Sequence, residues 1–152
     1  MSELQILEIQ IKRELSKLKN LLSEAEEIRN KKASNWNIRI GGSILHDFYT
    51  GTEGIFEAIA NTIDKRIPTG TNWHKELLNQ MVLDIPGLRT HIISEDTSKM
   101  LDEYLRFRHL FRKRYGFELE WKNIKHLLKS LPVVYAAVEK DIKEAFELPA
   151  SS

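Results

Sequence analysis

An all-α fold is predicted for this chain of 152 residues, as an up-and-down helical bundle with four to five main helices. Three observations support that prediction. Apolar residues recur three and four positions apart through most of the sequence, which is the period of a helix that buries one face. No segment alternates apolar and polar residues as a half-buried β-strand would. Short breaks that contain proline or glycine, at 68–70, 86–87 and 116, separate the periodic segments.

The first expected helix covers residues 2 to about 31. Lysine and glutamate occupy most of its faces, and a single apolar stripe runs along the remaining one. The residues of that stripe are Leu4, Leu7, Ile11, Leu15, Leu18, Leu22, Ala25 and Ile28. This pattern is typical of a bundle helix that packs against its neighbours.

A second helix begins near Trp36, where Ser34 or Asn35 can cap it, and continues towards the break at 68–70. Its apolar stripe consists of Ile40, Ile44, Phe48, Ile55, Ile59 and Ile63. Four glycines lie inside this segment, at 41, 42, 51 and 54, and each of them weakens helix propensity by about 1 kcal/mol. They either allow another helix to approach closely or mark a kink.

Three further helices complete the bundle. A short one covers 72–83 with Asn72 as its cap, and a fourth starts at Ser94 or Thr97 and stops at Gly116. The fifth spans about 120–147 and is bent or divided by Pro132. We therefore expect a single domain over 1–148 and a loose tail at 149–152.

Composition narrows the class of protein. The chain has 41% hydrophobic and 30% charged residues, no cysteine, and a formal net charge of +1. This composition suits a folded helical protein, and the lack of cysteine excludes disulfides and thiolate zinc sites. No apolar run approaches the ~20 residues of a membrane span, and the N-terminus does not resemble a secretory signal, so a cytoplasmic location is expected. Any attraction of nucleic acid must come from a local patch.

Such a patch lies at residues 106–115, RFRHLFRKRY, where five arginines and lysines accompany a histidine and a tyrosine without any acid. On a helix, residues seven apart return to nearly the same angle, so Arg108, Phe111, Arg112 and Tyr115 share one stripe. His109 and Lys113, four apart, lie together on the neighbouring stripe. Arginine binds phosphate oxygens, histidine transfers protons near neutral pH, and tyrosine stacks on bases. The mixture suits RNA binding or cleavage, although a solvated helix face has the same composition.

The run from Arg108 to Tyr115 resembles the R-x4-H-x-Y motif of HepT-like toxins in the HEPN superfamily. The resemblance extends to LHDFYTGTEGIFEAIANTID (45–64), PTGTNWHKELLNQM (68–81) and LDEYLRFRHLFRKRYGFELEW (101–121), and covers roughly residues 36–125. The three segments in this order are much more specific than the short motif alone.

The resemblance implies a helical bundle that forms homodimers, with two copies of the motif at a shared cleft. It also implies a metal-independent endoribonuclease that acts on RNA without a cofactor. Its expected partner is an antitoxin of the minimal nucleotidyltransferase (MNT) type, which in some such pairs AMPylates the motif tyrosine. A non-catalytic HEPN scaffold that binds RNA, nucleotide or the nucleotidyltransferase is the alternative.

Carried onto this chain, the motif arginine is Arg108 and the motif tyrosine, the expected AMPylation target, is Tyr115. Lys113 stands where histidine is expected, and lysine is a poor base at neutral pH. Lys113 then serves as an acid or electrostatic clamp, His109 supplies proton transfer instead, or the domain binds without cutting. Support for RNA binding is expected from the other basic residues of the segment, Arg106, Arg112 and Arg114.

The other histidines, at 46, 74, 91 and 126, show no metal-ligand spacing, so no metal site is expected. Trp73 and His74 are expected to pack at the start of a helix. On the second helix, His46 and acids such as Glu53 either line a cleft opposite the basic segment, where the acids would orient Arg108, or form an ordinary polar face.

Overall fold

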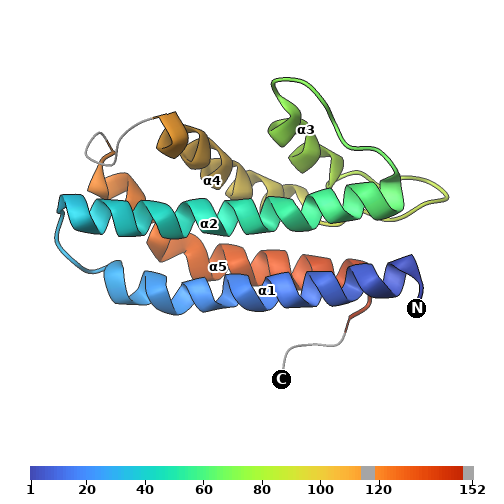
Figure 1. Ribbon diagram of the computed structural model, residues 1–152, viewed down its shortest axis with the longest axis horizontal. Coiled ribbons are helices and arrows are strands. Elements are labelled where there is room, and N and C mark those ends of the chain that lie inside the picture. The colour runs from blue at the N-terminus through green and yellow to red at the C-terminus, as the bar shows by residue number, and fades with distance from the viewer. Residues whose placement is uncertain (114–118, 149–152) are drawn as a thin grey trace.

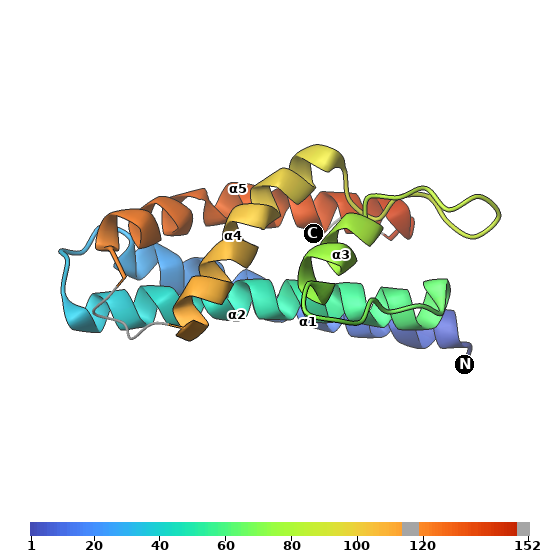
Figure 2. The same ribbon diagram turned by 90° about the horizontal axis from the view of Figure 1, so that it is seen from above.

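Five α-helices and one π-helical turn make up the bundle in a computed structural model, which describes residues 1–113 and 119–148. The elements are α1 (Glu3–Ile28), α2 (Asn35–Ile59), η1 (Ala60–Asp64), α3 (Trp73–Gln80), α4 (Glu95–Lys113) and α5 (Trp121–Ala145). The long helices α1, α2 and α5 lie side by side, with α1 antiparallel to α2 (Figure 1). Helix α4 crosses them obliquely, and α3 lies beside it against α2 (Figure 2). The prediction of an all-α, up-and-down bundle is confirmed.

Local sequence signals explain where several helices begin. Ser2 forms a capping box with Gln5 at the start of α1. The Ser34 hydroxyl accepts a hydrogen bond from the Asn37 amide at 3.0 Å and caps α2. For α4 the cap is Ser94, whose hydroxyl accepts from the Thr97 amide at 3.1 Å. In each pair of cap candidates, the first residue is the one that the fold uses.

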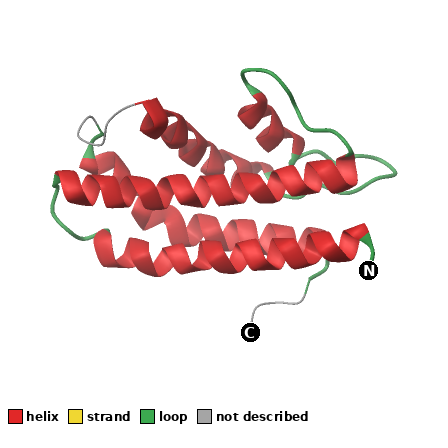
Figure 3. Ribbon diagram, viewed as in Figure 1, coloured by secondary structure: helices red, strands yellow, loops and turns green. Residues whose placement is uncertain are grey.

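Several details differ from the prediction. Leu4 lies in the first turn of α1 at the edge of the bundle and is 47% exposed, so it does not belong to the buried stripe. The side chain of Asn72 makes no capping hydrogen bond to α3. Pro132 does not divide α5, which continues as one helix to Ala145. Among the described residues, the one β-type pairing is a single bridge between Ile85 and Arg89; the other segments between helices are loops (Figure 3).

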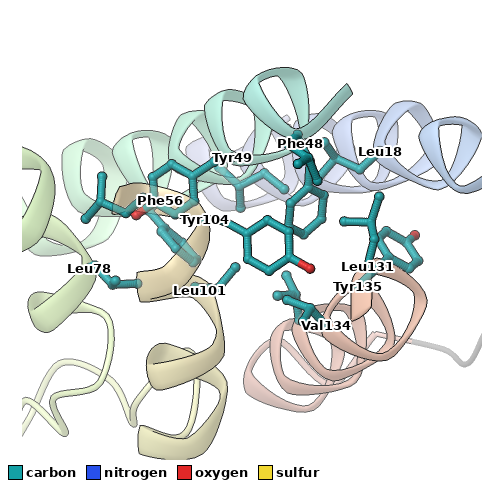
Figure 4. Close-up of a cluster of buried hydrophobic side chains, with 14 of the residues drawn as sticks. Leu18, Phe48, Tyr49, Phe56, Leu78, Leu101, Tyr104, Leu131, Val134 and Tyr135 are labelled. Atoms are coloured by element: carbon teal, nitrogen blue, oxygen red, sulfur yellow. The ribbon is translucent and has the colours of Figure 1, made fainter. Parts of the chain in front are cut away.

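Aromatic and aliphatic side chains from all five α-helices fill the core (Figure 4). Tyr104 from α4 is buried there and donates a hydrogen bond to the Leu127 carbonyl of α5 at 2.7 Å. Tyr135 from α5 donates to the Leu15 carbonyl of α1 at 2.9 Å. Because each buried hydroxyl is paired, both rings add apolar contact without leaving an unsatisfied donor.

The glycines of α2 let neighbouring helices approach closely. A Cβ at Gly42 would come within 2.7 Å of the Phe111 ring of α4, and one at Gly41 within 2.7 Å of Ile124 of α5. At Gly51 the conflict would be with Leu18 of α1, at 2.6 Å. A Cβ at Gly54 would meet nothing within 4 Å. The glycines therefore serve close approach at three positions, and the tight passage at Gly42 sets the depth at which α4 lies against α2.

Candidate functional site

Arg108 is the basic residue that the fold draws inward. It lies on the face of α4 that packs against α2 and is only 8% exposed. Its Nε donates a hydrogen bond to the Thr50 hydroxyl at 3.2 Å. This one bond fixes the plane of the guanidinium, and no described residue accepts from its Nη2 group. A guanidinium held in this way presents a fork of donors to an incoming anion.

A histidine and a carboxylate meet beside this arginine. Glu53 of α2 and His74 of α3 have side chains that are 4% and 12% exposed, and the Glu53 Oε2 lies 2.8 Å from the His74 Nδ1. A carboxylate this deeply buried requires a partner, because an unpaired charge in such surroundings is costly. The pair joins the middle of α2 to the first turn of α3.

The hydrogen bond decides which nitrogen of His74 carries a proton. An ionised carboxylate only accepts, so Nδ1 must donate to Glu53. The Arg108 Nη1, 3.5 Å from the same Nδ1, is then a close neighbour and not a donor to it. In the neutral ring, Nε2 keeps its lone pair, and no described residue pairs with it.

Two groups of the site have no partner among the described residues, the Arg108 Nη2 and the His74 Nε2. In the described part of the chain, the buried side-chain polar atom without a partner is the Tyr49 hydroxyl. The His74 side chain is 12% exposed, so solvent reaches part of its ring. One side of the site thus combines a fork of donors with a proton acceptor.

His109 adds a second imidazole to this cluster. Its ring packs edge-on against His74, with ring centroids 5.4 Å apart and an angle of 80° between the planes. Desolvation, followed by the charges of His74, Arg108 and Lys113, lowers the pKa of His109 below its ordinary value. These surroundings thus disfavour the charged form of His109. Although Arg108 and His109 point about 100° apart on α4, His74 contacts both, since it approaches from a different helix.

Helix α3 is anchored to α4 as well as to α2. Lys75 donates to Asp102 at 2.7 Å, while Leu77 and Leu78 are fully buried beneath. The same carboxylate pairs with Arg106 at 3.2 Å. The short helix, which is too short to be stable alone, is thereby fixed at the position that brings His74 to Arg108.

The electrostatics of α2 reflect the concentration of charge around Glu53. Desolvation, together with the charge of Glu53, raises the pKa of Glu57, and the charges of His74 and Arg108 oppose the rise. Burial raises the pKa of the Tyr49 hydroxyl, and Glu53 adds to the shift. Glu53 thus raises the pKa of both neighbouring groups on α2, in addition to the larger effect of burial.

The remaining residues of the basic segment lie outside this cluster. Arg106 has an exposed side chain that is engaged with Asp102, and Arg112 and Lys113 are exposed at the end of α4. Lys113 is close enough for its charge to lower the pKa of His109. Arg114 and Tyr115 lie outside the described residues.

Sequence reasoning did not identify two of the residues around Arg108. Thr50 orients the arginine. Glu53, an acid expected either to orient Arg108 or to form an ordinary polar face, pairs with His74 instead. His74 looked like a packing residue because 34 positions separate it from Arg108. Its Trp73 neighbour does pack, with ring centroids 3.7 Å apart, and this aromatic contact holds the imidazole from the other side. The signal that could have pointed to His74 was Glu53, because an acid that becomes buried in a helical bundle needs a partner there.

The described residues contain no group of three or more histidine, aspartate or glutamate side chains arranged to hold a metal ion. None of the described helices has the length and apolar character needed to cross a membrane.

Comparison with known proteins returns one finding. A family model described as HepT-like protein matches residues 41–148, which includes α3, α4 and all the residues of the site. Neither a curated protein nor a solved structure matches the chain.

Proposed function

This chain belongs to the family of HepT-like proteins in the HEPN superfamily, and we propose that it is the toxin of a toxin–antitoxin pair, a metal-independent endoribonuclease. The observation that carries the proposal is Arg108, almost buried on α4, bonded to Thr50 and left with Nη2 donors that no described residue uses. An exposed arginine would be an ordinary surface charge. An arginine that the fold holds in place with unpaired donors is arranged to bind an anion.

In this proposal Arg108 binds the scissile phosphate and stabilises the charge that develops on it. Charge stabilisation by groups that are already in place is usually the largest contribution to catalysis, and it needs no metal. His109 and Lys113 lie on the same side of α4 and are assigned to proton transfer and to stabilisation of charge. Arg106, Arg112 and Arg114 extend the basic surface along which RNA binds through its phosphates.

The proposal is tested by incubating the purified protein with cellular RNA in the presence of EDTA. Wild-type protein should cleave the RNA, and Arg108→Ala should reduce the rate by about 10²–10³-fold. Arg39→Ala, which removes an exposed arginine of α2, is the matched control and should cleave at the wild-type rate. Equal activity of Arg108→Ala and wild type would refute the assignment, and no cleavage by either would refute the enzymatic function.

The proposal includes the assembly and its partner. The chain acts in the cytoplasm as one domain over 1–148, pairs as a homodimer that brings two motif helices together, and is neutralised by an MNT-type nucleotidyltransferase that AMPylates Tyr115. Co-expression with that partner should raise the intact mass by one or more AMP units, and Tyr115→Phe should abolish the increase. Equal masses of the two proteins with and without the partner would exclude AMPylation at Tyr115.

One observation favours a second candidate, a non-catalytic HEPN scaffold that binds RNA, nucleotide or the nucleotidyltransferase. Lys113 is exposed at the position of the motif histidine, and a lysine there binds phosphate without serving as a base. Expression without the antitoxin distinguishes the two functions. A nuclease should arrest growth, whereas normal growth with soluble, unmodified protein would favour the scaffold.

A further inference from the structure

We propose that His74, positioned by Glu53, is the group that accepts the proton from the attacking ribose hydroxyl, in place of a histidine on the motif helix. This inference rests on the proposed ribonuclease function and adds a catalytic residue from another helix, α3. It answers the question that Lys113 raises, because a nuclease without a base on its motif helix needs one from elsewhere.

The hydrogen bond to Glu53 determines which nitrogen of the His74 imidazole can accept a proton. The Glu53 Oε2 lies 2.8 Å from the His74 Nδ1, so the carboxylate holds the proton on Nδ1 and leaves the lone pair on Nε2. A histidine base oriented by a carboxylate on its other nitrogen is a recurrent catalytic arrangement. Trp73 lies against the ring, with centroids 3.7 Å apart, and further restricts its rotation.

The position of His74 beside Arg108 also suits it to act on a bound RNA phosphate. The Arg108 Nη1 lies 3.5 Å from the His74 ring, so a phosphate bound by the guanidinium fork comes next to the imidazole. In RNA the 2′-hydroxyl is on the ribose that carries the scissile 3′-phosphate, which places nucleophile and phosphate side by side. The His74 side chain is 12% exposed, and no described residue pairs with its Nε2, which leaves that nitrogen for the hydroxyl.

The candidates on α4 fit this role less well. Among the described residues, no carboxylate fixes the tautomer of His109, and desolvation with the charges of its neighbours lowers its pKa, which makes it a weaker base. Lys113 is exposed at the end of α4, and a lysine amine is in general a poor base at neutral pH. Both are better suited to holding substrate and stabilising charge than to accepting the first proton.

The proposed step transfers one proton and exchanges one bond at phosphorus for another. The His74 Nε2 takes the proton of the 2′-hydroxyl while the 2′-oxygen forms a bond to phosphorus. The bond from phosphorus to the 5′-oxygen breaks with its electron pair, and that oxygen takes a proton from water. The products are a 2′,3′-cyclic phosphate and a 5′-hydroxyl, and the imidazolium then returns its proton to water. No oxidant, reductant or metal takes part in this step.

The decisive variant is His74→Asn. The asparagine amide can replace Nδ1 as the donor to Glu53 but has no equivalent of Nε2, so it preserves the anchor of α3 and removes the proton acceptor. We expect the cleavage rate to fall by about 10²–10⁴-fold, the range of general base catalysis, while RNA affinity and the thermal transition stay near wild type. Retention of cleavage within about threefold of wild type would show that His74 is only an anchor.

The chain supplies a matched control in His91. Its Nδ1 also lies 2.9 Å from a carboxylate, that of Asp84, but both groups are exposed and no contact joins them to Arg108. His91→Asn should cleave RNA at the wild-type rate. A loss of cleavage as large as that of His74→Asn would overturn the assignment, since any histidine–carboxylate pair would then have the same effect.

A second variant covers the case in which His74→Asn does not fold. In His74→Ala, added imidazole can occupy the vacated space and accept the proton, so cleavage should return in part; imidazole should restore nothing to Arg108→Ala. A folded His74→Ala protein that imidazole does not rescue would overturn the proton-transfer role. Cleavage by wild type together with full activity of His74→Asn overturns this inference alone, whereas inactive wild-type protein overturns the proposed function as well.

Glu53 is a positioning residue in this scheme, and its role has a readout that does not depend on activity. Nitrogen-15 NMR of the His74 ring should report the tautomer protonated at Nδ1 in the wild type. In Glu53→Ala the population should shift towards the tautomer protonated at Nε2, because the acceptor for the Nδ1 proton is gone. An unchanged tautomer would exclude Glu53 from this role.

Discussion

Two buried carboxylates in this protein have cationic or titratable partners. A comparison of the two distinguishes a cluster that stabilises the fold from a candidate functional site. Asp64, at the end of η1, pairs with Arg89, and their side chains are 3% and 6% exposed. Glu53 pairs with His74 beside Arg108 at comparable burial. Sequence context alone does not distinguish the two clusters.

The Asp64 cluster leaves no donor unused. Arg89 donates from Nε and Nη2 to the two carboxylate oxygens at 2.6 and 2.8 Å, and its other N–H groups reach backbone carbonyls of Gln80, Leu83 and Thr90. Gln80 adds a bond to Asp64 at 2.8 Å. Burial raises the pKa of Asp64, but these hydrogen bonds outweigh it and the net shift is downward.

The Glu53 cluster, in contrast, leaves hydrogen-bonding groups unused. Arg108 donates only to Thr50, and the His74 Nε2 has no partner within the described residues. Unused donors and acceptors at a solvent-facing position are costly for folding alone and useful for binding. Saturation of hydrogen bonds, and not burial or charge, therefore distinguishes the two clusters.

The largest expected effect tests the saturated cluster. Arg89→Ala leaves the Asp64 carboxylate buried without its partner and should cost about 3–5 kcal/mol in the free energy of unfolding, measured by denaturant titration. Arg89→Ala combined with Asp64→Asn should recover part of this loss, because it removes the buried charge. If Arg89→Ala is as mild as Arg39→Ala, the cluster is not structural. Arg108→Ala should instead lose activity with little loss of stability.

A second prediction tests how α4 is held at the site. Gly42→Ala should destabilise the protein by about 1–3 kcal/mol, because the added methyl would lie 2.7 Å from the Phe111 ring, and should also reduce RNA cleavage by moving Arg108. Gly54→Ala is the matched control on the same helix. With no atom within 4 Å it should stabilise the fold by up to about 1 kcal/mol through helix propensity. Similar effects of the two changes would refute the close-approach argument.

A third prediction concerns pH and the incomplete cluster. Since the pKa of His109 is lowered in the folded state, folding disfavours its charged form, and stability should fall as the pH drops below the unfolded value of about 6.5. NMR titration should place His109 below that value. Arg108→Gln removes one of the nearby charges and should move the midpoint upward. A midpoint that stays in place would show that Arg108 does not act on His109.

The smallest effect is expected at Glu57. Its raised pKa means that the charged form is disfavoured in the folded state, so stability should increase as the pH falls towards that pKa. Glu57→Gln should therefore stabilise the protein at neutral pH, by less than about 1 kcal/mol because the residue is partly exposed. Thermal unfolding of the two proteins at neutral pH measures the difference. Destabilisation would indicate that Glu57 provides a needed negative charge.

The fold class and most of the helix limits follow from the amino-acid sequence alone. Periodic apolar residues and serine caps are local signals, and they act within a few residues of the structure that they specify. The stripe from Leu7 to Ile28 and the caps at Ser34 and Ser94 follow from them. The motif segment also marked Arg108 as the residue to examine.

The groups that accompany Arg108 are brought together by the packing of the helices and could not be predicted from the sequence. His74 and Thr50 belong to other helices, and no periodicity links them to the basic segment across separations of 34 and 58 positions. Their meeting depends on the close passage of α4 at Gly42 and on the anchoring of α3 by Lys75 and its buried leucines. Packing between helices is a property of the whole bundle, so the site's chemistry emerged from contacts that the linear sequence does not display.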